Sequence, residues 1–553
     1  MSLIALRGLE QPFNYGQLRA LVVDDFPGMR NALKMTLSNF GVTRIDLAGS
    51  ATEAIFKVQN GHYDFILCDF NLGEGRDGQQ LLEELRYREL IGLKTVFVMV
   101  TAESVYEKVV STAELAPDDY LLKPFSAEVM RNRLEISLRR KQAFEAAFHC
   151  HEEGDLGGAI AACDLLLREK PKYLVDALRF KGESLNALGR YAEAEELYRR
   201  VISMRPIPWA RLGLAKALHL QNEDDAAEAL LREVLERAPQ LVTAYDVLAD
   251  IRLAKKDATG AQRALQAGVA ISARTVRRQQ KLGNLALDNG DLDTARTAFA
   301  TAIDKGQHSV FITPGDYGNL CRIHLEQGNL SGAMDTLRKG KLALQATPEG
   351  QLVVVVVHGQ VHNRNGNHAE ARKSLDEAAR LRAIGARVDG HLLLELAQGF
   401  LAYERHAEAD ATVSEVARNA HDSEVLLARA KRLYEAAGRA NDVEHLLSEA
   451  TREVRKLTTE GVMLAHKGDI QTAVERLLAA CSLAPFNPRI LMNGVWVILK
   501  GIELDGMNTE RLTKARSLLA AAERQNPGHS RIAGLRSQLQ EFESRFGLRR
   551  RSV

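Results

Sequence analysis

Hydrophobic and polar positions divide the chain near residue 140. Before that point five short apolar runs occur, and a segment with helical spacing of its apolar residues follows each one. The runs are LRALVVDD (18–25), RIDLAG (44–49), DFILCDF (64–70), TVFVMVT (95–101) and DYLLKP (119–124). Continuous apolar runs of this length are typical of strands buried on both faces of a parallel sheet. The alternation therefore predicts a doubly wound α/β domain over residues 18–141, after an N-terminal extension at 1–17.

From residue 142 onward a repeat replaces the strand pattern. A small residue recurs at 34-residue intervals, at Ala227, Ala261 and Ala295, and a large residue stands four positions after each one. Paired helices that approach closely need a small residue at such a point, and the large residue fills the gap to the next repeat. The pattern predicts an all-α superhelical solenoid of ten or eleven repeats over residues 142–528. A last helix at 529–546 would cap the stack, followed by a basic tail at 547–553.

The repeat becomes less regular toward the C-terminus. The small-residue markers continue at Ala333, Ala371, Ala409, Ala473 and Ala515. Spacings of 38 residues after about residue 340 predict longer loops, and residues 424–457 fit no regular repeat.

The two parts are joined without a flexible linker. Residues 126–153 contain neither Pro nor Gly, and their apolar residues keep a helical register. We expect one continuous helix here, with a rise of about 1.5 Å per residue and a length of roughly 40 Å. It would run from the α/β domain into the first repeat.

Composition narrows the function. Lys and Arg total 73 against 72 Asp and Glu, so the protein has no overall field that would attract nucleic acid or anionic lipid. The five cysteines are scattered and never form a C-x-x-C pair, which favours a reducing, cytoplasmic location. No apolar run is long enough for a membrane span. His358 and His362 lack the glutamate of an H-E-x-x-H motif, so we expect ordinary packing there, and a solvated face at the basic stretch 274–281.

Polar residues with a shared chemistry follow the predicted strands. They are Asp24 and Asp25 after the first strand, Asp69 after the third, Thr101 after the fourth and Lys123 after the fifth. In an open parallel sheet, functional groups gather outside the carboxyl ends of the strands. Crowded carboxylates repel each other unless a divalent cation lies among them. A cation held by oxygens, with a lysine and a hydroxyl nearby, is suited to handling a phosphoryl group.

On these residues the first part resembles the CheY-like receiver domain of bacterial two-component response regulators. The second part resembles tetratricopeptide repeats (TPR). The first resemblance implies that Asp69 accepts a phosphoryl group from a histidine kinase or a phosphotransfer protein. It also implies an Mg²⁺ site, whose protein ligands would be Asp24, Asp25, Asp69 and the backbone carbonyl of Asn71.

The same resemblance assigns a switch. Thr101 and Lys123 would contact the phosphoryl oxygens, with Ala102 small enough to admit the donor. Tyr120 matches the aromatic residue that turns inward when the hydroxyl moves toward the phosphoryl group. Asn71 and Glu103 match a pair found in CheY, which implies a short-lived signal.

One segment departs from the family pattern. NLGEGRDG (71–78) has Gly73 and Gly75, no proline, and one extra residue before Asp77 and Gly78. Because this loop borders the expected phosphorylation site, we expect it to affect access and phosphoryl lifetime.

These features favour a response regulator whose output is protein binding, without an enzymatic domain beyond the receiver's own phosphorylation and dephosphorylation chemistry. The TPR groove would bind a protein partner, such as another two-component protein, and we expect neither nucleic-acid binding nor membrane insertion. A different hypothesis is a phosphate sink that drains a kinase, with the repeats only localising it. A transcription-factor role is the third hypothesis, and the sequence favours it least.

Overall fold

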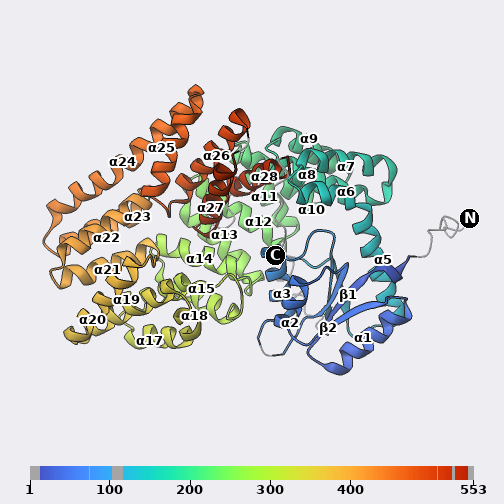
Figure 1. Cartoon of the computed structure of the whole chain (residues 1–553), viewed down its shortest axis with the longest axis horizontal. Helices are drawn as coiled ribbons and strands as arrows, with labels where there is room; N and C mark the ends of the chain where they lie inside the picture. Colours follow the sequence, from blue (N-terminus) through green and yellow to red (C-terminus); the bar gives the residue numbers. More distant parts are fainter. Residues whose placement is uncertain are drawn as a thin grey trace, which may run out of the picture.

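The computed structural model describes residues 13–73, 75–102, 116–421, 423–506, 508–525 and 530–545. An α/β domain at the start of the chain is followed by helices alone, which wind into a superhelix beside it (Figure 1). The predicted fold class, a doubly wound receiver-type domain followed by an all-α solenoid, is confirmed.

The α/β domain has one five-stranded parallel sheet in the order β2-β1-β3-β4-β5. Its strands are β1 (Arg19–Val23), β2 (Arg44–Ala48), β3 (Phe65–Asp69), β4 (Val96–Thr101) and β5 (Asp119–Leu122). Each one lies within one of the five apolar runs. The three central strands are almost completely buried, as expected of a sheet covered on both faces.

Helices cover both faces of the sheet. α1 (Pro27–Asn39) and α5 (Ala127–Ala143) pack on one face, and α2 (Ala51–Gln59) and α3 (Gly78–Tyr87) pack on the other. A short 3-10 helix, η1 (Tyr15–Gln17), precedes β1, and Tyr15 is only 3% exposed in the core beneath α1 and α5. The folded domain thus begins before residue 18, because residues placed in the extension contribute to its core.

The solenoid helices pack in consecutive pairs. Those of the first half are α6 (Glu145–Glu152), α7 (Leu156–Glu169), η3 (Pro171–Tyr173), α8 (Leu174–Ala187), α9 (Tyr191–Met204), α10 (Pro208–Leu220), α11 (Asp224–Arg237), α12 (Val242–Ala254), α13 (Ala258–Ile271), α14 (Val276–Asp288) and α15 (Leu292–Lys305). Those of the second half are α16 (Pro314–Glu326), α17 (Leu330–Lys339), α18 (Lys341–Gln345), α19 (Pro348–Arg364), α20 (His368–Ala383), α21 (Gly390–Ala402), α22 (His406–Asn419), α23 (Glu424–Ala436), α24 (Ala440–Lys467), α25 (Ile470–Leu483), α26 (Pro488–Asp505), α27 (Thr509–Gln525) and α28 (Ser530–Arg545).

The repeat markers have the packing role expected of them. Ala194 and Ala227, like the later marker alanines, are fully buried. Tyr198 stands four residues after Ala194 and lies between two glycines of neighbouring helices. A Cβ added at Gly182 would lie 2.6 Å from its ring, and one added at Gly213 would lie 2.4 Å from it. The small and large positions thus pack neighbouring repeats together.

Two irregularities have structural causes that differ from the expectation. The extra residues between Ala333 and Ala371 form the short helix α18 and lengthen α19, so the wider spacing there is not a longer loop. Residues 424–457 fit no repeat because α24 is 28 residues long and serves in two pairs. Its first part packs on α22 and α23, and α25 packs on α24 as well.

The basic stretch 274–281 is not simply a solvated face, as the sequence analysis expected. The Arg278 side chain is 1% exposed and binds the Asp246 carboxylate through Nε (2.9 Å) and Nη2 (2.6 Å). Lys281 pairs with Asp250 at 2.5 Å. These bases join α14 to α12, so they hold adjacent repeats in register.

The expected continuous helix over 126–153 is wrong in one respect. α5 ends at Ala143 and α6 begins at Glu145, with a bend at Phe144. Phe144 is 2% exposed, and its ring packs against those of Phe148 (5.4 Å between centroids), Tyr173 (6.2 Å) and Phe180 (6.3 Å). Burial of this ring among the first repeats accounts for the bend. The absence of a flexible linker is confirmed, because a single residue separates the two helices.

The last helix returns to the start of the solenoid. α28 packs on α26 and α27 and also contacts α8 (Figure 1). Gly154, in the α6–α7 turn, has φ +79°, and a Cβ added there would lie 2.5 Å from the Gln540 Cβ. The superhelix therefore brings its last helix against its first pairs.

All five cysteines are free thiols. Among the described helices, none combines the length and apolar character needed to cross a membrane.

The junction can be tested by replacing Phe144. We expect Phe144→Ala to lower the free energy of local unfolding of α6–α8 by about 3–5 kcal/mol, because a buried aromatic ring is lost from the cluster. Hydrogen exchange of the amides of these helices measures the effect. Phe56→Ala is the matched control, since Phe56 is 66% exposed on α2. Equal effects of the two substitutions would contradict this role.

Candidate functional site

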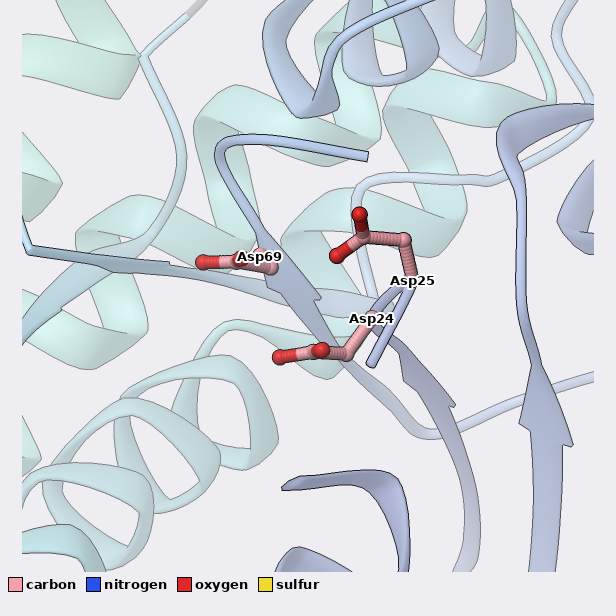
Figure 2. Close-up of side chains that lie close together, drawn as sticks. All are labelled: Asp24, Asp25 and Asp69. Atoms are coloured by element: carbon pink, nitrogen blue, oxygen red, sulfur yellow. The ribbon is translucent and has the colours of Figure 1, made fainter. Parts of the chain in front are cut away.

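Three carboxylates meet at the carboxyl ends of β1 and β3. In the parallel register of these strands Val23 lies opposite Cys68, so the next residues, Asp24 and Asp69, leave the sheet side by side. Asp25 follows Asp24 in the same loop. One carboxylate oxygen of each of the three residues lies within 4.8 Å of those of the other two, and Figure 2 shows the side chains gathered together.

The three acids differ in exposure and contacts. Asp24 is 1% exposed, and its Oδ1 accepts a hydrogen bond from the Phe26 backbone N–H (2.9 Å). The Asp69 side chain is 13% exposed, whereas Asp25 is exposed to solvent. A reactant can therefore reach the cluster from the Asp25 side.

Lys123 supplies the positive charge of the site. Its Nζ lies 3.1 Å from Asp69 Oδ1 and 3.3 Å from Asp24 Oδ2. Burial raises the pKa of the Asp69 carboxyl above its usual value. The Lys123 ammonium opposes that rise and the Asp24 carboxylate adds to it.

The other predicted residues surround this cluster. Thr101 ends β4 and is 4% exposed, and its carbonyl accepts the Lys123 backbone N–H (2.8 Å). Tyr120 is partly buried on β5, against the core that α2 and α3 cover. Asn71 is exposed two residues after Asp69. Ala102 is exposed directly after Thr101, and Glu103 lies outside the described residues.

The unusual loop after Asp69 has a specific backbone shape. Gly73 and Gly75 have φ values of +73° and +104°, which favour glycine, and a Cβ at Gly73 would lie 3.0 Å from Asp25 Oδ2. At Gly78 an added Cβ would lie 2.2 Å from the Asp69 carbonyl oxygen. The loop therefore passes close to the cluster at both ends.

A capping box that the sequence analysis missed fixes the end of this loop. The Gln80 backbone N–H donates to Asp77 Oδ1 (2.8 Å), and the Asp77 backbone N–H donates to Gln80 Oε1 (3.1 Å). The residues DGQQ have the acid and the glutamine three positions apart that such a box requires. The start of α3 is thus tied to the loop that leaves Asp69.

The donor set fits a divalent cation. Mg²⁺ prefers oxygen ligands and is commonly bound through one or two carboxylates together with phosphate oxygens. Asp24, Asp25 and Asp69 form the only group of three or more His, Cys, Asp or Glu residues, within the described ranges, that could hold a metal ion together. His358 and His362 belong to no such group, and their ring centroids are 6.3 Å apart.

Comparison with known proteins identifies both parts of the chain. The family model of the response regulator receiver domain matches residues 20–135, and that of the tetratricopeptide repeat matches 181–242 and 281–349. The chemotaxis protein CheY of Pseudomonas aeruginosa is 33% identical over 123 residues, which are 22% of this chain and 98% of that protein. This chain belongs to the response regulator family. CheY-3 of Vibrio cholerae is 30% identical over 22% of this response regulator and 93% of its own length.

Solved structures match a similar share of this response regulator. A two-component response regulator from Clostridium difficile is 29% identical, with a TM-score of 0.21, over 22% of this chain and 98% of its own. The receiver family model matches the N-terminal domain, and the tetratricopeptide-repeat model matches residues beyond it.

The cluster predicts cation binding that weakens with acid. We expect Asp24→Asn to lower Mg²⁺ affinity by about tenfold or more, because a buried ligand loses its charge. For the wild type we expect Mg²⁺ affinity to fall as the pH is lowered and Asp69 takes up a proton. Because the pKa of Asp69 is raised, the fall should begin at a higher pH than for an ordinary aspartate. Isothermal titration calorimetry measures both effects. Glu128→Gln, at an exposed acid of α5, is the control, and an equal loss there would contradict the site.

Proposed function

We propose that this chain is a phosphorylation-controlled response regulator. In this proposal Asp69 accepts a phosphoryl group from a histidine kinase or phosphotransfer protein, with Mg²⁺, and the solenoid binds a protein partner according to the state of Asp69. In this proposal the output of the described solenoid is binding rather than an enzymatic reaction. The protein works in the cytoplasm, and its five free cysteines agree with a reducing compartment.

One observation carries the proposal. The Asp69 carboxylate, which is mostly shielded from solvent, lies at the end of a buried strand. It is within 4.8 Å of two further carboxylates and 3.1 Å from the Lys123 ammonium. This arrangement combines a nucleophilic oxygen, a divalent-cation site and a fixed positive charge. Those are the parts that phosphoryl transfer requires.

The transfer step uses this chain's own groups. An oxygen of the Asp69 carboxylate attacks the phosphorus of the donor phosphohistidine, so that a P–O bond forms and the P–N bond breaks. The released imidazole nitrogen takes a proton from solvent. Lys123 pairs with the added charge, and the Thr101 hydroxyl donates a hydrogen bond to a phosphoryl oxygen. Asp24, Asp25, Asp69 and the Asn71 carbonyl would hold Mg²⁺, which would supply positive charge to offset that of the entering phosphoryl group.

Burial supports the nucleophilic role of Asp69. The residues before it in β3 are fully buried, and its own pKa is raised because desolvation disfavours its charge. A poorly solvated carboxylate is a better nucleophile than a fully hydrated one. Phosphorylation replaces the single charge of the carboxylate with the larger charge of an acyl phosphate beside Asp24, and the Lys123 ammonium 3.1 Å from Asp69 is placed to offset it.

The acceptor role can be tested with a small phosphoryl donor. Incubation with phosphoramidate and Mg²⁺ is expected to add one phosphoryl group to the wild type and none to Asp69→Asn, as measured by intact-mass spectrometry. We expect Lys123→Ala to slow uptake by about tenfold or more, since a charge that contacts the product is lost. Glu128→Gln should react like the wild type. Uptake by Asp69→Asn at the wild-type rate would overturn the assignment.

The switch requires a second measurement. Full-length protein, used as bait with and without beryllofluoride and Mg²⁺ as a phosphoryl mimic, should capture its partner to extents that differ about tenfold. A bias of about 1.4 kcal/mol between two states changes their ratio by that factor. Asp69→Ala should capture equally under both conditions. Equal capture by the wild type would exclude the switch and leave the phosphate-sink hypothesis.

A further inference from the structure

The receiver contacts the solenoid at a place far from the chain junction. One face of α3 carries Gln80, Glu83 and Tyr87, whose spacing aligns them along the helix. Gln80 Nε2 donates to the Lys305 carbonyl at the end of α15 (3.2 Å). The Tyr87 ring meets the Phe311 ring, in the α15–α16 loop, edge-on with 5.1 Å between centroids. The contact joins residues more than 220 positions apart in the sequence.

A positive charge of the solenoid completes this surface. The Arg277 guanidinium, on α14, lies 5.3 Å from the centroid of the Phe311 ring. It also acts on Glu83: burial raises the pKa of Glu83 to about 7, and both the Gln79 side chain and Arg277 oppose that rise. Polar, aromatic and charged groups of α3 thus each have a counterpart on α14–α16.

The interface is small. Tyr87 stays 48% exposed and Arg277 is exposed, although both take part in it. Small and partly polar contacts between domains are typical of reversible docking rather than of a permanent core. Figure 1 shows α3 on the side of the receiver that faces α14 and α15.

The same helix is tied to Asp69. The Gly78 backbone N–H donates to the Phe70 carbonyl (2.8 Å), and Gly78 has no room for a Cβ against the Asp69 carbonyl. Gln80 has two roles: its Oε1 closes the capping box on Asp77, and its Nε2 reaches the solenoid. One amide side chain therefore bridges the loop after Asp69 and the α15 terminus.

We propose that the α3 face docks reversibly on the α14–α16 surface, with Gln80 as the coupling residue, and that a phosphoryl group on Asp69 loosens this docking through the 70–78 loop. The coupling rests on the proposed phosphorylation of Asp69, whereas the docking does not. A displaced loop shifts the capping box, and with it the Gln80 donor that meets Lys305. The receiver then releases the middle of the solenoid while α5 and α6 still hold its beginning.

The docking is tested in the full-length chain with Gln80→Glu. Glutamate at this position still accepts the Asp77 N–H, so the cap survives, but it cannot donate to the Lys305 carbonyl and places a charge against it. We expect the amides of residues 306–312 to exchange at least about threefold faster in hydrogen–deuterium exchange. Gln59→Glu, which adds the same charge at an exposed position of α2, should leave them unchanged. Unchanged exchange in Gln80→Glu would overturn the docking.

A pair of substitutions checks the result independently. Tyr87→Ala and Phe311→Ala should each speed the exchange of the same amides. The double variant should exchange little faster than either single one, because both substitutions remove the same ring contact. Fully additive effects would overturn the contact.

Coupling is tested on the wild type with beryllofluoride and Mg²⁺, which should reproduce the Gln80→Glu exchange pattern, whereas Asp69→Asn should not respond. If Asp69 takes up a phosphoryl group and the exchange is unchanged, the coupling is overturned. If phosphoryl uptake itself fails, the proposed function is overturned, and the substitutions alone decide whether the docking exists.

Discussion

The repulsion among three carboxylates is the constraint on which the site depends. The register of β1 and β3 forces Asp24 and Asp69 together, and the sheet leaves them no freedom to separate. One ammonium, Lys123, bridges both acids, and it reaches them because β5 ends beside β4. Burial is the main cause of the raised pKa of Asp69, the Asp24 carboxylate adds to it, and the Lys123 ammonium opposes it. A cation or a change in the charge of Asp69 alters that balance directly.

The response to such a change depends on what can move. β1 and β3 are each paired with a strand on both sides. The loop after Asp69, in contrast, contains Gly73 and Gly75 at positive φ. Its far end is fixed to α3 by the capping box of Asp77 and Gln80. In the proposed coupling, a rearrangement at Asp69 would reach α3 along this loop. That helix is the part of the receiver that meets the middle of the solenoid.

Local sequence patterns were enough to predict the sheet and the meeting of Asp24, Asp25 and Asp69. Each apolar run contains one strand, and the acids after β1 and β3 meet because parallel strands end at one edge. The bend at Phe144 could not be read from the sequence, since it depends on rings from η3 and α8 that a helical pattern does not reveal. The double use of α24 was hidden for a related reason: a continuous helix carries no turn signal between two repeats. The α3 contact joins Gln80 to Lys305, and no local pattern encodes a pairing at that separation.

The solenoid also gains contacts that a simple repeat array lacks. In such arrays each unit touches only its neighbours, so curvature is a sum of small and independent rotations. Here Glu152, at the end of α6, accepts the Leu93 backbone N–H of the receiver, and Gly154, two residues later, lies against α28. The receiver thus spans from the first helix pair to α14–α16, and α28 joins the last pairs to the first. Contacts between distant repeats fix the sum of the rotations, so the loss of one of them shifts the curvature of every repeat between its ends. In the proposed docking, release of α14–α16 by the receiver would remove one such contact, and its effect would extend to the repeats between α6 and α16 as well as to the residues that the receiver touches.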